Sequence, residues 1–226
     1  MQHFAFIPFV LIVAGVGLSF VRILPAMVGW VVAVLGVLVG LAFAVYEGFA
    51  EDPNFWLALF VALPSMVAIP MIVKDLRYPK INDISTNLED PPEFVAACRT
   101  AANRERDMSF PKKNGQIIRQ SYKNVGPLYL DESSAQAFER VEQLARIQPG
   151  WVVTRIDVGE LSIESEVISS IFRFVDDVII KVSAQTGKTR IDMRSKSCDG
   201  LVDAGANAKR IERFLKELEN LSSTNK

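Results

Sequence analysis

The stretch DVIIKVSAQTGKTRIDMRS, residues 177–195, decides the expected fold of the second part of the chain. Apolar and polar side chains alternate on both sides of the turn signal AQTGKT, which is typical of two half-buried strands joined as a hairpin. One face of this hairpin carries Val178, Ile180, Val182, Thr189, Ile191 and Met193. We therefore predict an antiparallel sheet with one buried apolar face and one solvated polar face.

The polar face of the expected sheet is strongly charged. The stretch ELSIESEV, residues 160–167, alternates in the same way, and GWVVTRID, residues 150–157, indicates another strand. The polar face then carries Glu164, Glu166, Lys181, Arg190, Asp192 and Arg194. We expect a solvated ladder of opposite charges, which supports strand pairing. A docking surface for a partner or for lipid headgroups is the alternative.

Two helices are expected to cover the apolar face. SSAQAFERVEQLARI, residues 133–147, opens with a capping box formed by Ser133 and Gln136. Another helix follows the turn around Gly205. The apolar stripes of these helices contain Phe138, Val141, Leu144, Ala145, Ile211, Phe214, Leu215, Leu218 and Leu221. The expected fold class is α+β, an antiparallel sheet with its helices packed on one face.

The organisation of the chain follows from its composition. We expect a transmembrane region over residues 1–75, an extended linker over 76–91 and an α+β domain over 92–222. At the start of the domain, the spacing of apolar residues in PPEFVAACRTAAN, residues 91–103, predicts a helix. FPKKNGQ after it indicates a turn-rich loop, and VGPLYLD indicates a short strand.

The first 75 residues belong to a different class from the rest. Their charged residues are Arg22, Glu47, Glu51, Asp52, Lys74 and Asp75. Uncharged runs over about 4–21, 23–46 and 53–73 each approach the roughly 20 residues needed to cross a hydrocarbon core. A signal peptide fits poorly, because no basic segment precedes the first run and no clear cleavage site follows it. We predict three transmembrane helices.

Basic residues near the helix ends predict the orientation. Arg22 lies in the first loop, and Lys74, Arg77 and Lys80 follow the third helix. In a protein with three spans these two places share one side, and Lys and Arg favour the cytoplasmic side. We therefore expect an integral multi-pass protein whose C-terminal domain is cytoplasmic.

Small residues form a stripe on the second expected helix, at Gly29, Ala33, Gly36 and Gly40. Such residues let helix backbones approach closely in a membrane. Packing against the other two helices is one interpretation, and a homo-oligomer seam is the other. The expected partners are thus the lipid bilayer and a membrane protein or a second copy.

Several ordered motifs in residues 81–220 resemble a known family. They are NDIST, DPPEF, YKNVGPLYLD, the pair Gly150 and Trp151, FRFVDDVIIKV, RIDMRSKS and VDAGANAKRI. On these motifs the chain resembles the widespread bacterial and plastid family called domain of unknown function 1499. It departs from that family at ISSIFRF and at CDGL. The resemblance implies a fold and a membrane-linked setting, for which we expect the bacterial inner (plasma) membrane, and it implies no activity.

The first group of candidate site residues precedes a strand. Arg173, Asp176 and Asp177 lie in the stretch FRFVDD. Adjacent side chains of an extended chain point to opposite faces, so Asp176 and Asp177 are not expected to act as a carboxylate dyad. Turn and strand-start chemistry is one interpretation. A polar recognition site that includes Arg173 is the other.

The second group opens the last helix. Asp203 can accept hydrogen bonds from the first-turn N–H groups, and Asn207 and Arg210 lie three residues apart on one helical face. That face can tie the helix to the sheet through Asp192 or Asp177. Recognition of a ligand or partner by Asn207 and Arg210 is the alternative.

Catalytic chemistry is poorly supplied. The single histidine, His3, lies at the N-terminus, so the domain lacks histidine-based nucleophile pairs. Cys98 and Cys198 lie far apart and have no metal-ligand spacing. We expect two free thiols, no cofactor and no metal. The 25 basic and 26 acidic residues give no basic surplus that would indicate a nucleic-acid partner.

These observations favour a membrane-anchored binding module over an enzyme. The alternatives are an enzyme that acts on a lipid or cell-envelope substrate and a structural subunit of a membrane complex.

Overall fold

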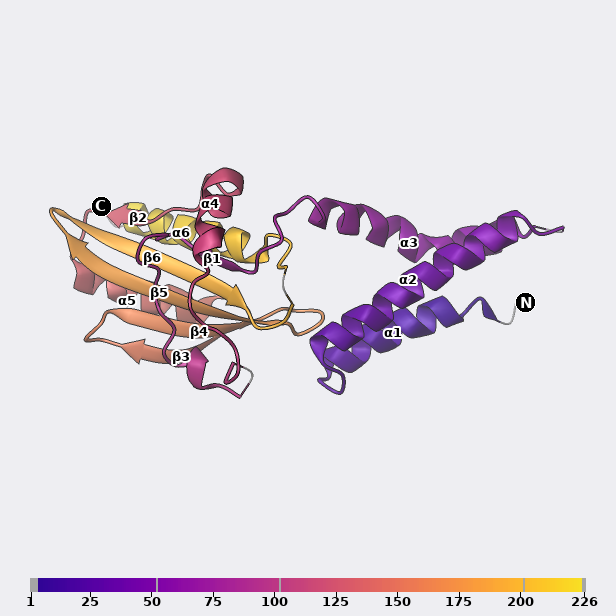
Figure 1. Cartoon of the computed structure of the whole chain (residues 1–226), viewed down its shortest axis with the longest axis horizontal. Coiled ribbons are helices and arrows are strands. Elements are labelled where there is room, and N and C mark those ends of the chain that lie inside the picture. Colours follow the sequence, from indigo (N-terminus) through magenta and orange to yellow (C-terminus); the bar gives the residue numbers. More distant parts are fainter. Residues whose placement is uncertain (1–3, 52, 102, 201, 225–226) are drawn as a thin grey trace. The chain divides into compact units, whose positions relative to one another are not determined.

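The computed structural model describes residues 4–51, 53–101, 103–200 and 202–224, and His3 and Asp52 lie outside them. The chain divides into two compact units, coloured along the sequence in Figure 1. One unit contains Met1–Arg77 together with Ser169–Phe174, and the other contains Tyr78–Ile168 together with Val175–Lys226.

The first unit is helical. It contains α1 (Ile7–Phe20), α2 (Ala26–Gly48) and α3 (Phe55–Asp75). Among the described helices, α2 and α3 are long and apolar enough to cross a membrane. The 14 residues of α1 correspond to about 21 Å, less than a hydrocarbon core of about 30 Å. The prediction of three spans is therefore supported for two helices, and the first helix is shorter than predicted.

The small residues of α2 pack inside this unit. A methyl group added at Gly36 would lie 2.7 Å from the carbonyl oxygen of Pro8 in α1, and one added at Gly40 would lie 2.8 Å from that of Val61 in α3. Gly29 and Ala33 are also buried, and both approach Gly15 of α1. The close approach is possible because these residues have little or no side chain. Within this unit the small residues of α2 thus pack against α1 and α3, and the homo-oligomer seam stays a prediction.

This packing makes Gly36 sensitive to a single methyl group. We expect Gly36→Ala to destabilise the helical unit by roughly 1–3 kcal/mol, because backbone atoms of α1 would have to move. The matched control is Gly17→Ala, which meets nothing within 4 Å and should be neutral or slightly stabilising. Thermal unfolding in detergent, followed by circular dichroism, measures both. Equal midpoints for the two variants would contradict the packing.

The second unit is built on an antiparallel sheet, as predicted. In the described residues six strands pair in the order β1-β6-β5-β4-β3, and β2 also pairs with β6. Their bounds are β1 Asp83–Ser85, β2 Leu128–Leu130, β3 Trp151–Asp157, β4 Ser162–Ile168, β5 Val175–Gln185 and β6 Lys188–Ser197. The β5–β6 hairpin has the expected register, with Gln185 opposite Lys188 across the turn.

Three helices complete the main core. They are α4 (Lys112–Ser121), α5 (Ser134–Ile147) and α6 (Ala206–Thr224). The predicted capping box at Ser133 is present. The predicted apolar stripes are buried against the apolar strand face, except that Leu221 is exposed. Trp151 of β3 stacks on Phe214 of α6, with ring centroids 5.1 Å apart.

The face expected to be solvated is covered, and this corrects the sequence prediction. Glu164, Asp192 and Arg194 are buried, and Glu164 and Arg194 lie beneath residues 87–101 and 103–110, a covering segment that crosses the sheet on the side opposite α5 and α6 (Figure 1). Glu166 and Arg190 are half-buried, and Lys181 is exposed. A second small core, formed by Phe94, Ala97, Met108 and Ile179, lies under the same segment. Alternation alone did not reveal the cover, because the covering segment has little regular structure.

Local assignments near this segment also change. The helix expected over 91–103 is reduced to a short 3₁₀ turn, Ala97–Arg99. Its preceding N–H groups bind the Glu164 carboxylate instead of continuing a helix. The loop expected after Phe110 is instead the start of α4, with Pro111 at its N-cap. The expected linker, 76–91, contains β1, because Asp83–Ser85 pairs with β6.

Candidate functional site

A polar cluster joins α6 to the end of the sheet. Arg210 of α6 donates hydrogen bonds to Asp176 of β5 and, over 2.7 Å, to the hydroxyl of Ser195 of β6. The side chains of Arg210 and Asp176 are about nine-tenths buried. An ion pair removed from water in this way is held by its geometry and by additional hydrogen bonds. We call Asp176, Ser195, Asn207 and Arg210 the helix latch.

Asn207 is the centre of the helix latch and is fully buried. Its Nδ2 donates to the carbonyl oxygen of Asn82 and to the hydroxyl of Ser197, both over 3.0 Å. Its Oδ1 accepts a hydrogen bond of 2.6 Å from the Ser195 hydroxyl. Asn207 therefore connects α6, β6 and the residue before β1. The polar atoms of its side chain are occupied by these internal partners.

The start of α6 is fixed by Asp203 and Gly205. The Asp203 carboxylate accepts from the backbone N–H groups of Gly205 and Asn207, at 2.9 and 3.0 Å, so the predicted cap is present. Gly205 has φ +76°, and a methyl group there would lie 2.6 Å from the ring of Tyr78. Only glycine adopts this conformation without cost and also leaves room for the ring. Burial raises the pKa of Asp203.

Asp177 lies on the opposite face of β5 from Asp176, as the strand alternation predicts. Its Oδ2 accepts hydrogen bonds from Asn103 Nδ2, at 2.7 Å, and from the Cys198 thiol, at 3.1 Å. Burial raises the pKa of Asp177, although both hydrogen bonds oppose that effect. Burial and the nearby Asp177 carboxylate raise the pKa of Cys198. The thiol is therefore protonated at neutral pH and a poor nucleophile.

A buried ion cluster lies on the same face as Asp177. The Arg194 guanidinium donates to both carboxylate oxygens of Asp83, at 2.9 and 2.8 Å, and Lys196 donates to Asp83 over 3.1 Å. Arg194 also donates to the carbonyl oxygens of Pro92 and Met108. Its guanidinium lies 4.8 Å and 5.4 Å from the ring centroids of Phe94 and Phe110. We call Asp83, Arg194 and Lys196 the buried ion cluster.

The Glu164 carboxylate binds the backbone of the same covering segment. The backbone N–H groups of Val95, Ala96 and Ala97 donate to it over 2.9–3.1 Å. Arg155 of β3 lies 3.6 Å from it. Through these three hydrogen bonds Glu164 holds the segment at the point where a helix was expected.

The six predicted site residues do not meet in one place. Asp176, Asp203, Asn207 and Arg210 lie around the start of α6, and Asp177 lies on the other face of the sheet. Arg173 lies in Ser169–Phe174, which belongs to the other compact unit. The expected partner of Arg210 was Asp192 or Asp177. The structure uses Asp176, because Asp192 and Asp177 face away from α6 and Asp192 instead binds Thr86 and Arg190.

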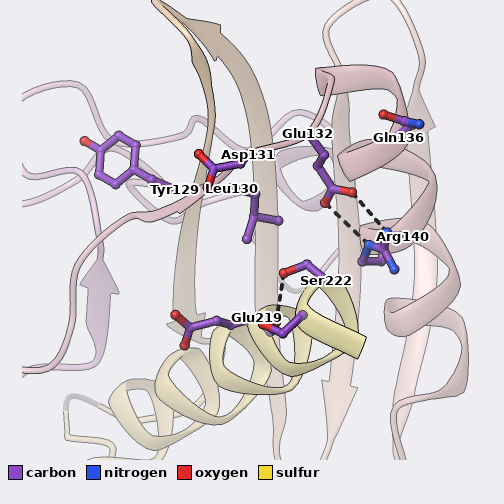
Figure 2. A pocket seen from close by; sticks show the side chains of 9 residues that line it. Tyr129, Leu130, Asp131, Glu132, Gln136, Arg140, Glu219 and Ser222 are labelled. Atoms are coloured by element: carbon purple, nitrogen blue, oxygen red, sulfur yellow. Dashed lines mark hydrogen bonds and ion pairs between the residues drawn. The ribbon is translucent and has the colours of Figure 1, made fainter. Parts of the chain in front are cut away.

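A shallow pocket of about 360 Å³ lies near the C-terminal end of α6. Figure 2 shows its lining, in which Glu132 pairs with Arg140 and the Ser222 hydroxyl donates to the Glu219 carbonyl oxygen. Arg140 also donates to the Leu221 carbonyl oxygen, over 3.2 Å. None of the predicted site residues lines it. Its lining comes from β2, the residues between β2 and α5, and the helices α5 and α6, so local sequence patterns gave no signal for it.

The part of the chain that the structure describes contains no group of three His, Cys, Asp or Glu side chains that could hold a metal ion. Cys98 and Cys198 are free.

The helix latch and the buried ion cluster lie within one matched region. The family described as Protein of unknown function (DUF1499) matches residues 83–218. The chain belongs to this family. The DUF1499 match starts at Asp83 of the buried ion cluster and extends past Arg210 of the helix latch, so the expected resemblance over 81–220 is confirmed. No curated protein matches the chain.

Sequence reasoning missed the burial of Asp83, Glu164 and Arg194 in this DUF1499 domain. Asp83 was placed in a linker, and the other two were placed on a solvated face. Their shared signal was weak: each is a charged residue with one apolar and one polar neighbour in the sequence. Their burial depends on the covering segment and cannot be deduced from the local sequence.

The contacts of the helix latch predict that replacing Arg210 strongly lowers the stability of the fold. Replacing Arg210 by Met leaves the buried Asp176 carboxylate unpaired, which should cost roughly 3–5 kcal/mol. The matched control is Arg213→Met, because Arg213 lies on the exposed side of α6 and should change stability by less than about 0.5 kcal/mol. Denaturant unfolding of the full chain measures both. An Arg210→Met chain with the wild-type midpoint would contradict the latch and favour the recognition alternative.

Asp177 predicts a pH dependence with a definite sign. Its pKa is raised in the folded state, so folded protein binds more protons than unfolded protein between the two pKa values. The stability contributed by protonated Asp177 is therefore lost as the pH rises from about 4 through the folded-state pKa. Asp177→Asn removes this loss, and its stability relative to wild type should increase over that range. Denaturant midpoints at a series of pH values measure the difference. If the stability of Asp177→Asn relative to wild type stayed constant or fell as the pH rises, the raised pKa of Asp177 would be contradicted.

Proposed function

We propose that this protein is a membrane-anchored binding module. Its apolar N-terminal helices lie in the membrane, and its DUF1499 domain binds a partner at the membrane surface. Support for the anchor comes from α2 and α3, which have the length and composition of membrane spans. Their outward side chains include exposed Leu35, Leu38, Phe60 and Val67, which lipid would cover.

The observation that carries the proposal is the short connection between α3 and the domain. The helix α3 ends at Asp75, and Tyr78 already packs on the domain core. Three residue steps span at most about 11 Å. A domain held by so short a connection stays at the surface of the membrane that α3 crosses. Binding partners would then be membrane proteins, lipids or molecules that arrive there.

The polar residues of the predicted site make their contacts inside the domain, which favours binding over catalysis. The Arg210–Asp176 pair is mostly buried, and Asp177 is engaged by Asn103 and Cys198 on the other face. Residues arranged in this way stabilise the fold, which leaves recognition to the loops and ends of the domain. The enzyme alternative would require Arg173, Asp176, Asp177 and Arg210 to act on one substrate. The opposite facing of the two aspartates weighs against it.

The charge distribution supports a cytoplasmic domain. Arg22 and the group Lys74, Arg77 and Lys80 favour the cytoplasmic side in a three-span arrangement. A chain in which only α2 and α3 cross the membrane keeps the same side for Arg22 and Lys74, because two spans separate them. The orientation is thus independent of whether the shorter α1 also crosses.

Membrane fractionation with protease mapping tests this function. The full chain, with a C-terminal tag, should remain in the membrane pellet after alkaline carbonate extraction. In intact spheroplasts the tag should resist added protease, and in lysed spheroplasts it should be cleaved. Release by carbonate would contradict the anchor. Cleavage in intact spheroplasts would contradict the cytoplasmic orientation and direct the search toward cell-envelope partners.

A further inference from the structure

The strand β3 forms one border of the DUF1499 sheet (Figure 1). Its seven residues, Trp151–Asp157, pair with β4 on one side. Among the described residues no strand pairs with its other side, where the Trp151 N–H donates to the Gln148 carbonyl oxygen. One row of backbone N–H and C=O groups therefore faces outward from β3. Such a border can accept a further strand through main-chain hydrogen bonds.

The two borders of the sheet differ in how well they are protected. On the opposite border, β1 and β2 contain three residues each. Short edge strands, prolines and lysines are common devices against edge pairing. The strand β3 is longer and contains neither proline nor lysine. It has a bulge at Thr154, but the register with β4 is regular again over residues 155–157. The segment after the bulge thus remains an open edge.

Exposed apolar side chains gather along β3. In the described part of this unit, the large exposed apolar side chains are Tyr129, Ile147, Val152, Val158, Val202 and Leu221. Val152 lies within β3, Val158 follows its last residue, and Ile147 lies at the end of α5, shortly before its first residue. Val158 is 70% exposed and Ile147 is 74% exposed. Apolar groups along an unpaired edge indicate a contact surface.

The charges of β3 suit a second copy of the same strand. Arg155 and Asp157 form an ion pair, so the strand has no net charge, and both side chains are 27% exposed. In an antiparallel pair centred on Ile156, Arg155 of each copy stands opposite Asp157 of the other. Opposite charges on neighbouring strands favour pairing, whereas a pair centred on Arg155 would bring two like charges together. The charge pattern therefore selects the register centred on Ile156.

We infer that β3 is a homodimerisation edge, at which two copies of the chain join their sheets in antiparallel register about a two-fold axis. The self-complementary charges favour a second copy over an extended segment of another protein. This inference goes beyond the proposed function by naming a partner for the DUF1499 domain. It uses residues of this domain alone, so it holds or fails independently of the membrane anchor.

Crosslinking of the full chain in phosphatidylcholine vesicles tests the register. The background variant is Cys98→Ser, which removes the exposed thiol. Pairing centred on Ile156 places Thr154 of one copy opposite Val158 of the other, and both residues are exposed. Chains with Thr154→Cys and chains with Val158→Cys carry different tags, are reconstituted together and are treated with a short reagent that joins two thiols. Val202→Cys, in an exposed loop, is the matched control.

The expected result is a crosslink between the two differently tagged chains. Its yield should exceed by several-fold the yield from Thr154→Cys chains alone, because two copies of Thr154 lie four residues apart along the paired strands. It should also exceed by several-fold the yield from Thr154→Cys mixed with Val202→Cys. Equal yields in the three mixtures would overturn the edge pairing, since random collisions would explain them. The Cys98→Ser chain alone measures the contribution of Cys198.

A lysine at the edge provides a second measurement. We expect Thr154→Lys to shift the full chain from dimer to monomer in sedimentation velocity over a concentration series, because two added cations would lie in the interface. Val202→Lys adds the same charge away from β3 and should leave the dimer intact. Thermal unfolding midpoints equal to wild type show that both variants keep their fold.

Three other outcomes would overturn the inference. A wild-type chain that stays monomeric and gives no crosslink has no such edge contact. A dimer that persists in Thr154→Lys uses another surface. A monomeric chain whose Thr154→Cys thiol is nevertheless protected from maleimide in native membranes would replace the second copy by a strand of another protein.

Discussion

Burial of the Arg194 guanidinium is the constraint on which the polar side of the DUF1499 domain depends. A cation removed from water must find partners for its N–H groups. Arg194 finds them in both carboxylate oxygens of Asp83 and in the carbonyl oxygens of Pro92 and Met108. The forked geometry of arginine suits this set, which a lysine could not reproduce. One side chain of β6 thereby holds β1 and both ends of the covering segment.

The remaining polar contacts extend this arrangement across the domain. Glu164 fixes the middle of the covering segment through three backbone N–H groups, and Asn103 attaches its later part to Asp177. On the other side of the sheet, Asn207 and Arg210 attach α6 to β5 and β6. Charged and amide side chains thus add to the apolar packing on both faces of the sheet. The polar residues matched by the family are therefore explained largely by cohesion.

This cohesion has a consequence for where the protein can act. A sheet with both faces covered offers its ends and loops for recognition. One end of the sheet carries the pocket lined by Glu132, Arg140 and Glu219.

The sequence by itself determined the elements whose pattern is local. Strand alternation located the β5–β6 hairpin and the apolar face, the capping box located α5, and Asp203 located the start of α6. It also indicated that Asp176 and Asp177 face apart, because alternation is a property of the extended backbone. Tertiary structure alone decided that the charged face is buried. Residues 87–101 and 103–110 cover it with scarcely any periodic structure, and their contacts join residues about 70–100 positions apart in the chain. No short-range pattern records such contacts, which is why Asp83, Glu164 and Arg194 were assigned to solvent or to a linker.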